Sequence, residues 1–177
     1  MTTILLARHG ETDWNREGRL QGWDDRPLNE TGREQARELA RRLADVPFDA
    51  VYASDLTRAR QTAEIVAEPH RVPVLIDPDL REMHYGTWSG LTRSEIEERF
   101  PGVERHDGET REQHLGRVFG AADRIARRHP GQRILIVSHG GSMRALRRHC
   151  VGDPVHPIEN CGVYELTFRD GVFAPVD

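Results

Sequence analysis

The stretch TILLARHG at residues 3–10 begins with five apolar or β-branched residues and ends in an arginine, a histidine and a glycine. Short runs of this kind are typical of strands that are covered on both faces of a parallel sheet. The stretch ILIVSHGG at residues 134–141 repeats the pattern, because a histidine and two glycines follow its apolar residues. Parallel sheets bind their ligands at the carboxyl ends of the strands. The two stretches therefore predict two histidines at one edge of a sheet.

The rest of the chain alternates short apolar runs with amphipathic segments. Strands covered on both faces are predicted at residues 50–53 and 74–76. Helices are predicted at residues 29–45, 56–67 and 141–150, and two more begin at capping boxes at Thr92 and Thr110. The helix that begins at Thr110 carries an apolar stripe of Leu115, Val118, Phe119, Ala122 and Ile125.

Near the end of the chain, residues 163–168 and 172–174 flank Asp170-Gly171, which predicts an antiparallel hairpin. Alternating strands and helices need crossover connections, and these place helices on both faces of a sheet. We therefore expect an α/β fold, a three-layer α/β/α sandwich with a mainly parallel sheet and an antiparallel edge strand. No repeat or linker interrupts the pattern, so residues 1–177 are expected to form a single domain.

Composition excludes several classes of partner. The chain has 177 residues, 37% of them hydrophobic, and a formal net charge of −4. It lacks the basic field that attracts nucleic acid or an anionic membrane. The N-terminus does not resemble a signal peptide, and Cys150 and Cys161 suit free thiols in a reducing compartment, so a cytoplasmic location is expected. These features are compatible with a homodimer but do not predict one.

All 25 basic residues are arginine, because the sequence contains no lysine. An arginine next to any given residue is therefore weak evidence of function. Arg8 and Arg58 carry more weight, since each follows an expected strand at the edge where the two histidines gather. Arginine binds phosphate oxygens through a planar fork, and glycine lets backbone N–H groups approach the same anion.

The pattern of Arg8, Arg58, His9 and His139 thus predicts a phosphate site. A neutral imidazole can serve as a nucleophile toward phosphorus, and nearby arginines favour the neutral ring. A leaving alkoxide needs a proton, which Glu82 could supply from the same edge. A metal site of two histidines and Glu82 is the competing interpretation, but flanking arginines oppose it. The other histidines are expected at the surface: His70, His106, His114, His129, His149 and His156.

Several blocks of this sequence together resemble one family. They are residues 6–12, 14–15, 21–23, 27–28, Gly32, 35–36, 54–56, 58–59, 61–63, Glu82, 85–86, Trp88, 90–91, 95–96 and 138–141. In this order they are similar to the histidine phosphatase superfamily, the group that contains the cofactor-dependent phosphoglycerate mutases. The resemblance covers nearly all of the chain.

The resemblance implies a role for each matching residue. His9 would be the nucleophile that becomes phosphohistidine, and Glu82 would be the proton donor and acceptor. The phosphoryl group would be held by Arg8, Arg58, His139, Asn15 and the backbone of Gly140. Substrate-lining positions would be Gln21, Gly22 and Tyr85. The family needs no metal for this chemistry, and we expect no cofactor.

The resemblance leaves two activities open. The mutases carry a long insertion between the proton-donor block and the Ser-His-Gly block, whereas only residues 91–137 fill that interval here. In the mutases this insertion closes over the site, and a shorter segment leaves the phosphohistidine open to water. The short interval therefore favours a phosphomonoesterase acting on a small phosphorylated metabolite. A phosphoglycerate mutase is the alternative, because residues 82–86 are similar to the mutase version. A non-catalytic phosphate-binding regulator is less consistent with the intact set of His9, Glu82 and His139.

Overall fold

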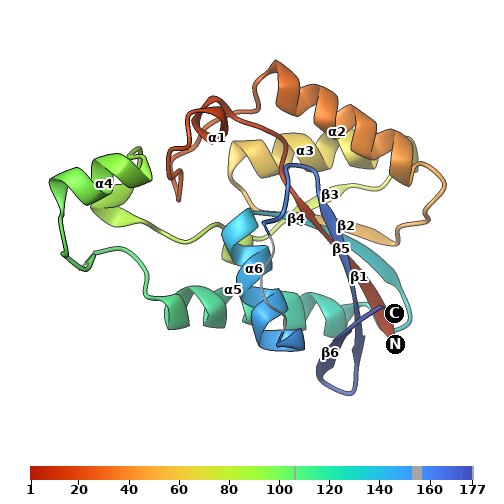
Figure 1. The fold of residues 1–177 in the computed structure, drawn as a ribbon. Helices are drawn as coiled ribbons and strands as arrows, with labels where there is room; N and C mark the ends of the chain where they lie inside the picture. Colours follow the sequence, from red (N-terminus) through yellow and green to blue (C-terminus); the bar gives the residue numbers. More distant parts are fainter. Residues whose placement is uncertain (106, 153–156, 177) are drawn as a thin grey trace.

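The computed structural model describes residues 1–105, 107–152 and 157–176. Its centre is a six-stranded sheet in the order β3-β2-β4-β1-β5-β6 (Figure 1). The strands are β1 (Thr2–Arg8), β2 (Ala50–Ala53), β3 (Val74–Ile76), β4 (Arg133–Ser138), β5 (Val163–Arg169) and β6 (Val172–Pro175). The first four run parallel, and β5 and β6 continue the sheet antiparallel. This arrangement confirms the expected α/β fold, and β5 and β6 form the predicted antiparallel hairpin at one edge of the sheet.

The helices cover both faces of this sheet (Figure 1). The α-helices are α1 (Asp13–Arg16), α2 (Glu30–Leu43), α3 (Thr57–Ala67), α4 (Arg93–Arg99), α5 (Arg111–Arg128) and α6 (Gly140–Val151). Three short 3-10 turns complete the chain: η1 (Glu68–His70), η2 (Pro78–Leu80) and η3 (Gly86–Trp88). The capping boxes expected at Thr92 and Thr110 are both present. Helix α4 stands away from the sheet, on the side of the structure that also carries α1.

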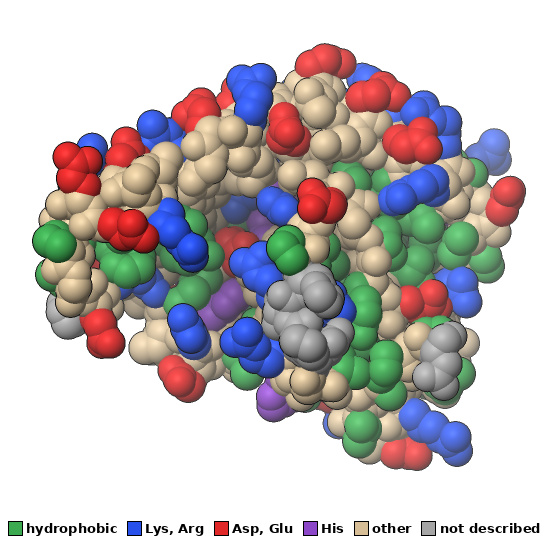
Figure 2. All heavy atoms as spheres, viewed as in Figure 1, with side chains coloured by type: hydrophobic (Ala, Val, Ile, Leu, Met, Phe, Trp, Pro, Cys, Tyr) green, Lys and Arg blue, Asp and Glu red, His purple; other side chains and the backbone are tan. Residues whose placement is uncertain are grey.

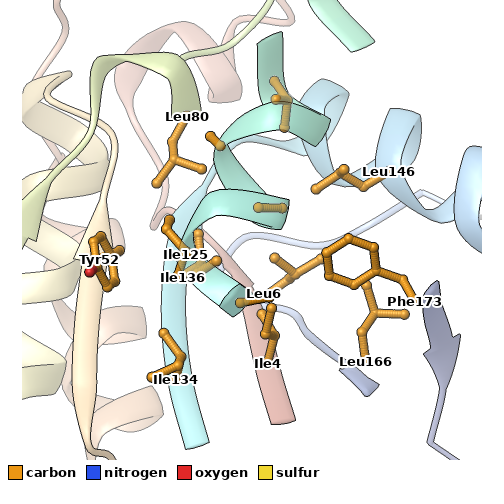
Figure 3. Close-up of a cluster of buried hydrophobic side chains, with 14 of the residues drawn as sticks. Ile4, Leu6, Tyr52, Leu80, Ile125, Ile134, Ile136, Leu146, Leu166 and Phe173 are labelled. Carbon is orange, nitrogen blue, oxygen red and sulfur yellow. The ribbon is translucent and has the colours of Figure 1, made fainter. Parts of the chain in front are cut away.

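Alternation along the strands divides the core into two layers. Ile4 and Leu6 of β1 face α5 and α6, and this layer includes Ile134, Ile136 and Leu80 (Figure 3). Leu5 and Ala7 face the opposite side, where they pack with α2 and α3. The central strands β1 and β4 are thus buried on both faces, which fixes their register.

Strand β3 differs from its prediction. Its residues were expected to be covered on both faces, yet it is an edge strand, and Leu75 and Ile76 are 40% and 45% exposed. The apolar run alone cannot distinguish a central strand from an edge strand, because both contain β-branched residues. Among the described residues, no helix is both long and apolar enough to cross a membrane.

Candidate active site

The two histidines lie side by side at the carboxyl ends of the two central strands. Arg8 pairs with Ser138 in the parallel register of β1 and β4, so His9 and His139 are the next residues on adjacent strands. Their ring centroids are 5.1 Å apart, and the side chains are buried. The predicted meeting of the two apolar-His-Gly stretches is therefore a direct result of strand register.

The loop backbone fixes the tautomer of His9. Its Nδ1 lies 2.7 Å from the carbonyl oxygen of Gly10. A carbonyl oxygen can only accept, so Nδ1 carries the proton in this hydrogen bond and the neutral ring keeps its lone pair on Nε2. The amide of Gly10 donates to Thr62 Oγ1 at 3.0 Å, which ties the loop to α3. The result is a rigid imidazole with a basic nitrogen on the side away from this loop.

Two arginines bring positive charge into the site. Arg58 is only 1% exposed, and its Nη atoms donate to the carbonyl oxygens of Gly22 and Asp24 at 2.7 and 2.8 Å. Arg8 donates through Nη1 to Ile158 O at 2.6 Å. In the described part of the chain, the Nε atoms of both arginines are buried without a hydrogen-bond partner.

The ring nitrogens of His139 are also buried without a partner among the described residues. Buried polar groups are normally satisfied, so this set of donors indicates room for an anion. Burial lowers the pKa of Arg58 to about 10, but the group is still charged at neutral pH.

Burial and positive charge act together on the histidines. The pKa of His9 is held well below its usual value of 6.5, first by burial and then by the charges of Arg58 and Arg8. The pKa of His139 is lowered in the same way, first by burial and then by Arg58. Both rings are therefore neutral at neutral pH and remain so on moderate acidification, which keeps the Nε2 lone pair of His9 available.

These lowered pKa values predict acid sensitivity of the fold. Below about pH 6.5 the unfolded chain binds a proton on each ring while the folded protein does not. The free energy of unfolding is therefore expected to decrease as the pH is lowered below about 6.5, by up to about 1.4 kcal/mol per pH unit for each histidine. Urea unfolding at a series of pH values checks this, with His139→Gln as the comparison. The variant should show a shallower slope, and an equal slope in both proteins would contradict the assignment.

Glu82 reaches the same edge from the segment after η2. Its Oε2 accepts from the amide of Gly141 and its Oε1 from that of Met83, both at 2.8 Å. A Cβ atom on Gly141 would lie only 2.2 Å from Oε1, so glycine at this position makes room for the carboxylate. Arg117 of α5 holds the backbone of this segment by donating to the carbonyl oxygens of Arg81 and Glu82.

The remaining predicted residues surround this centre at different depths. Asn15, on α1, accepts through Oδ1 from the amide of Thr12, and Gln21 accepts through Oε1 from Thr12 Oγ1. Gly22 adopts a φ of +53° and presents its carbonyl oxygen to Arg58. Gly140 opens helix α6, directly after His139.

A large cavity lies next to Glu82, and of the predicted site residues Tyr85 lines it. Its volume is about 1350 Å³, and Figure 2 shows a hollow whose floor carries acidic, arginine and histidine side chains. Tyr85, Met83 and Gly141 lie on the side near Glu82, while Ile96 and Phe100 come from the region of α4. The negative charge of Glu82, and then burial, raise the pKa of the Tyr85 hydroxyl above its usual value. Tyr85 therefore stays protonated and can donate a hydrogen bond into the cavity.

His114 was expected at the surface, and this prediction is wrong. The side chain is only 4% exposed and lies on α5 behind Glu82. The buried stripe of α5 includes His114, Val118, Ala121 and Ile125, whereas Leu115 is half-buried. His114 lies four residues before Val118, so helical spacing places both side chains on the buried face of α5. The prediction missed this because it assigned only apolar residues to that face.

The other histidines differ among themselves. His149 is exposed, as expected, while His70 and His129 are half-buried. His106 and His156 lie outside the described residues. Within the described ranges, no group of three or more histidine, cysteine, aspartate or glutamate side chains is arranged to hold a metal ion.

Fold and site first define a class: an α/β protein with a cationic, histidine-containing pocket at the carboxyl ends of its central strands. Comparison with known proteins then gives the family. The model of the histidine phosphatase superfamily, branch 1, matches residues 4–176. The chain therefore belongs to this family, which confirms the resemblance found in the sequence, and it is an enzyme with phosphatase activity.

Individual relatives agree with this placement. The chain is similar to the uncharacterized phosphatase PhoE of Bacillus subtilis, with 38% identity over 87% of this chain and 80% of the relative. It is 40% identical to the metal-independent phosphoserine phosphatase of Arabidopsis thaliana, over 82% of this chain and 67% of that one. The solved structure of YhfR from Bacillus stearothermophilus matches with a TM-score of 0.92 and 35% identity, over 99% and 95% of the two chains. Other relatives are named as phosphoglycerate mutases or mutase-like proteins.

Proposed function

We propose that the protein is a metal-independent phosphomonoesterase that hydrolyses a small phosphorylated metabolite through a phosphohistidine on His9. The observation that carries this proposal is the fixed tautomer of His9, whose Nδ1 donates to Gly10 O and leaves Nε2 as the free nucleophile. Among the described residues, Arg8 Nε, Arg58 Nε and the ring nitrogens of His139 are buried without a hydrogen-bond partner, and the charges of both arginines act on the ring of His9. A phosphate ester dianion satisfies these donors and brings its phosphorus atom to a nucleophile.

In the first step, His9 Nε2 attacks phosphorus and the bond from phosphorus to the ester oxygen breaks. Arg8, Arg58, His139 and Asn15 stabilise the equatorial oxygens, with help from the backbone N–H of Gly140 at the start of α6. Glu82, in its protonated form, gives its proton to the leaving oxygen. The alcohol departs, and the phosphoryl group is bonded to His9.

In the second step, a water molecule attacks phosphorus from the side that the alcohol has left. Glu82, now a carboxylate, takes one proton from this water, the bond from phosphorus to Nε2 breaks, and inorganic phosphate leaves. The enzyme regains both its free imidazole and its protonated acid. The cycle therefore balances without a metal ion or a redox partner.

The leaving group would occupy the cavity beside Glu82, with Gln21, Gly22 and Tyr85 on the substrate side. Pockets for drug-sized ligands have volumes of roughly 300–1,000 Å³, so a cavity of about 1350 Å³ has room for water beside a small metabolite. Access of water to phosphohistidine favours hydrolysis over return of the phosphoryl group to a second substrate. The Arabidopsis phosphoserine phosphatase and the solved phosphoserine phosphatase of Entamoeba histolytica, crystallised with phosphoserine or 3-phosphoglyceric acid, support small phosphorylated acids as first substrates to test.

Hydrolysis of p-nitrophenyl phosphate in the presence of EDTA tests the metal-free mechanism. Full activity is expected with the chelator, because every group in the proposed cycle belongs to the protein. Activity that disappears with EDTA and returns with a divalent metal would overturn it. A panel of phosphorylated metabolites, phosphoserine included, would then identify the substrate.

Phosphoglycerate mutase activity is the alternative outcome. Incubation with 3-phosphoglycerate and 2,3-bisphosphoglycerate distinguishes phosphatase from mutase activity, because a phosphatase releases free phosphate and a mutase accumulates 2-phosphoglycerate. We expect free phosphate as the main product. A single catalytic domain over residues 1–177, a cytoplasmic location and a homodimer remain proposals, and the family match over residues 4–176 supports the first of these.

A further inference from the structure

Asn160 lies beside the proposed nucleophile, in the turn that leads into β5. Its side-chain Nδ2 donates to the carbonyl oxygen of His9 at 3.0 Å and to Oδ1 of Asn15 at 3.3 Å. One amide group therefore contacts both the proposed nucleophile and a residue that is expected to hold the phosphoryl group. Asn160 itself takes no part in the proposed cycle.

The backbone of this turn is attached to the end of β1. The amide of Arg8 donates to the carbonyl oxygen of Gly162 at 3.0 Å. In the other direction, the amide of Cys161 donates to the carbonyl oxygens of Arg8 and His9 at 3.1 and 3.4 Å. Asn160 is half-buried and directly precedes Cys161, so these bonds hold its side chain next to His9.

The orientation of both side-chain amides follows from the atoms that they face. A backbone carbonyl oxygen only accepts hydrogen bonds, so the group of Asn160 next to His9 O is the NH2 group. The same NH2 group faces Asn15, which must therefore present its oxygen. The amide of Thr12 donates to this Oδ1 at 3.1 Å, which requires the same orientation. Thr12 Oγ1 also lies 3.3 Å from Oδ1, but it gives its single proton to Gln21 Oε1 at 2.8 Å.

The second polar atom of Asn15, its Nδ2, is left for a ligand. Within the described ranges this atom makes no hydrogen bond. An NH2 group only donates, so Asn15 offers a donor to the anion that is expected beside His9. A donor that is already oriented stabilises a developing anion without reorganisation during the reaction. An amide that could turn over would present its oxygen to the phosphate part of the time, and the two would repel each other.

We propose that Asn160 is a positioning residue, which holds the amide of Asn15 with Nδ2 directed at the phosphoryl oxygens. The proposal rests on the proposed function, in which Asn15 helps to bind the phosphoryl group. Asn160 acts through Asn15 rather than through His9. The backbone of His9 stays anchored without Asn160, since its N–H donates to Ser138 O at 3.0 Å and its carbonyl oxygen also accepts from Cys161.

The test is a double-mutant cycle of Asn160→Ala and Asn15→Ala, read as kcat/KM on p-nitrophenyl phosphate and as the inhibition constant of inorganic phosphate. Asn15→Ala should lower kcat/KM by about 10²-fold, the scale for loss of one preorganised donor. Asn160→Ala should lower it by about 10-fold and weaken inhibition by phosphate, because the donor is present but no longer held. In the Asn15→Ala protein, adding Asn160→Ala should change both quantities by less than about twofold.

Asn29→Ala is the matched control. Asn29 also holds the loop after β1, since its Nδ2 donates to Glu11 Oε1 at 2.8 Å, and it caps α2 by accepting from Gly32 N. Its hydrogen bonds within the described part of the chain do not include Asn15. Any loss that Asn29→Ala causes through the fold should therefore be the same with and without Asn15.

An equal loss from Asn160→Ala in both backgrounds would show a purely structural role and overturn the proposal. A loss in Asn15→Ala without one in Asn160→Ala would also overturn it, and would leave the proposed function intact. Unchanged kcat/KM and phosphate inhibition in Asn15→Ala would overturn the role of Asn15 in the proposed function itself. If Asn160→Ala does not fold, as judged by circular dichroism, Asn160→Leu gives the same test, because leucine fills a similar volume without donating a hydrogen bond.

Discussion

His9→Ala is expected to lower kcat/KM on every phosphate ester by about 10³-fold or more, the scale seen when a nucleophile is removed from an enzyme. The reason is that the proposed reaction passes through a bond to His9 Nε2, and water in its place has no comparable position or basicity. The loss should not depend on the leaving group, because a good leaving group still needs a nucleophile. Steady-state assays with p-nitrophenyl phosphate and an aliphatic ester measure it.

His70→Ala is the matched control for this variant. His70 lies in η1, beyond the end of α3 that is opposite Arg58, and its ring packs edge-on against that of Phe48 with the ring centroids 4.9 Å apart. It should retain the activity of the unchanged protein. A His9→Ala protein that is folded, as judged by circular dichroism, and still hydrolyses p-nitrophenyl phosphate at a substantial rate would exclude His9 as the nucleophile.

Arg58→Met is expected to cost about 10²–10³-fold in kcat/KM, comparable to the loss of one preorganised donor to a developing anion. Methionine keeps much of the length of the buried side chain but removes the charge. The same change should abolish the stabilisation that inorganic phosphate gives to the unchanged protein, which amounts to about 2.7 kcal/mol at a phosphate concentration 100 times Kd. Thermal unfolding with and without phosphate measures this second effect independently of catalysis.

Arg60→Met, two residues further along α3, provides the control. Its side chain is 48% exposed and faces Glu64, so it shares the helix and the chemistry of Arg58 without its burial. We expect unchanged kcat/KM and an unchanged phosphate effect on unfolding. If Arg58→Met kept the full phosphate-induced stabilisation, the anion would have to bind elsewhere.

Much of the fold follows from patterns that depend on neighbouring residues in the sequence. The apolar stretch in β1 and its counterpart in β4 predicted central strands, and their register places His9 beside His139. Capping residues Thr92 and Thr110 predicted helix starts because the side-chain hydrogen bonds of a cap are local. Local rules therefore suffice for the strands, the longer helices and the edge of the sheet at which the site forms, whereas α1 and the three 3-10 turns were not predicted.

Features that depend on tertiary contacts were harder to predict. The exposure of β3 follows from the strand order, which its own residues do not encode. His114 was expected at the surface because its sequence context is unlike that of His9 and His139. Only the fold shows that Ser142 and Glu82 lie next to it. The arginines show the same dependence on tertiary contacts. In a sequence so rich in arginine, no single arginine could be assigned a function, and only burial in the fold distinguishes Arg58 from Arg60.

Direct detection of the covalent intermediate tests the central claim best. The Glu82→Gln protein, mixed with p-nitrophenyl phosphate, should still form the phosphoenzyme, because the leaving group needs no proton. Its hydrolysis should be slow, since no carboxylate is present to take a proton from water. Mass spectrometry of rapidly quenched, digested protein is then predicted to find one phosphoryl group on the peptide that contains His9, and none in the His9→Ala, Glu82→Gln double variant. A phosphoryl group on another residue, or a burst of p-nitrophenolate without any phosphorylated peptide, would contradict the account.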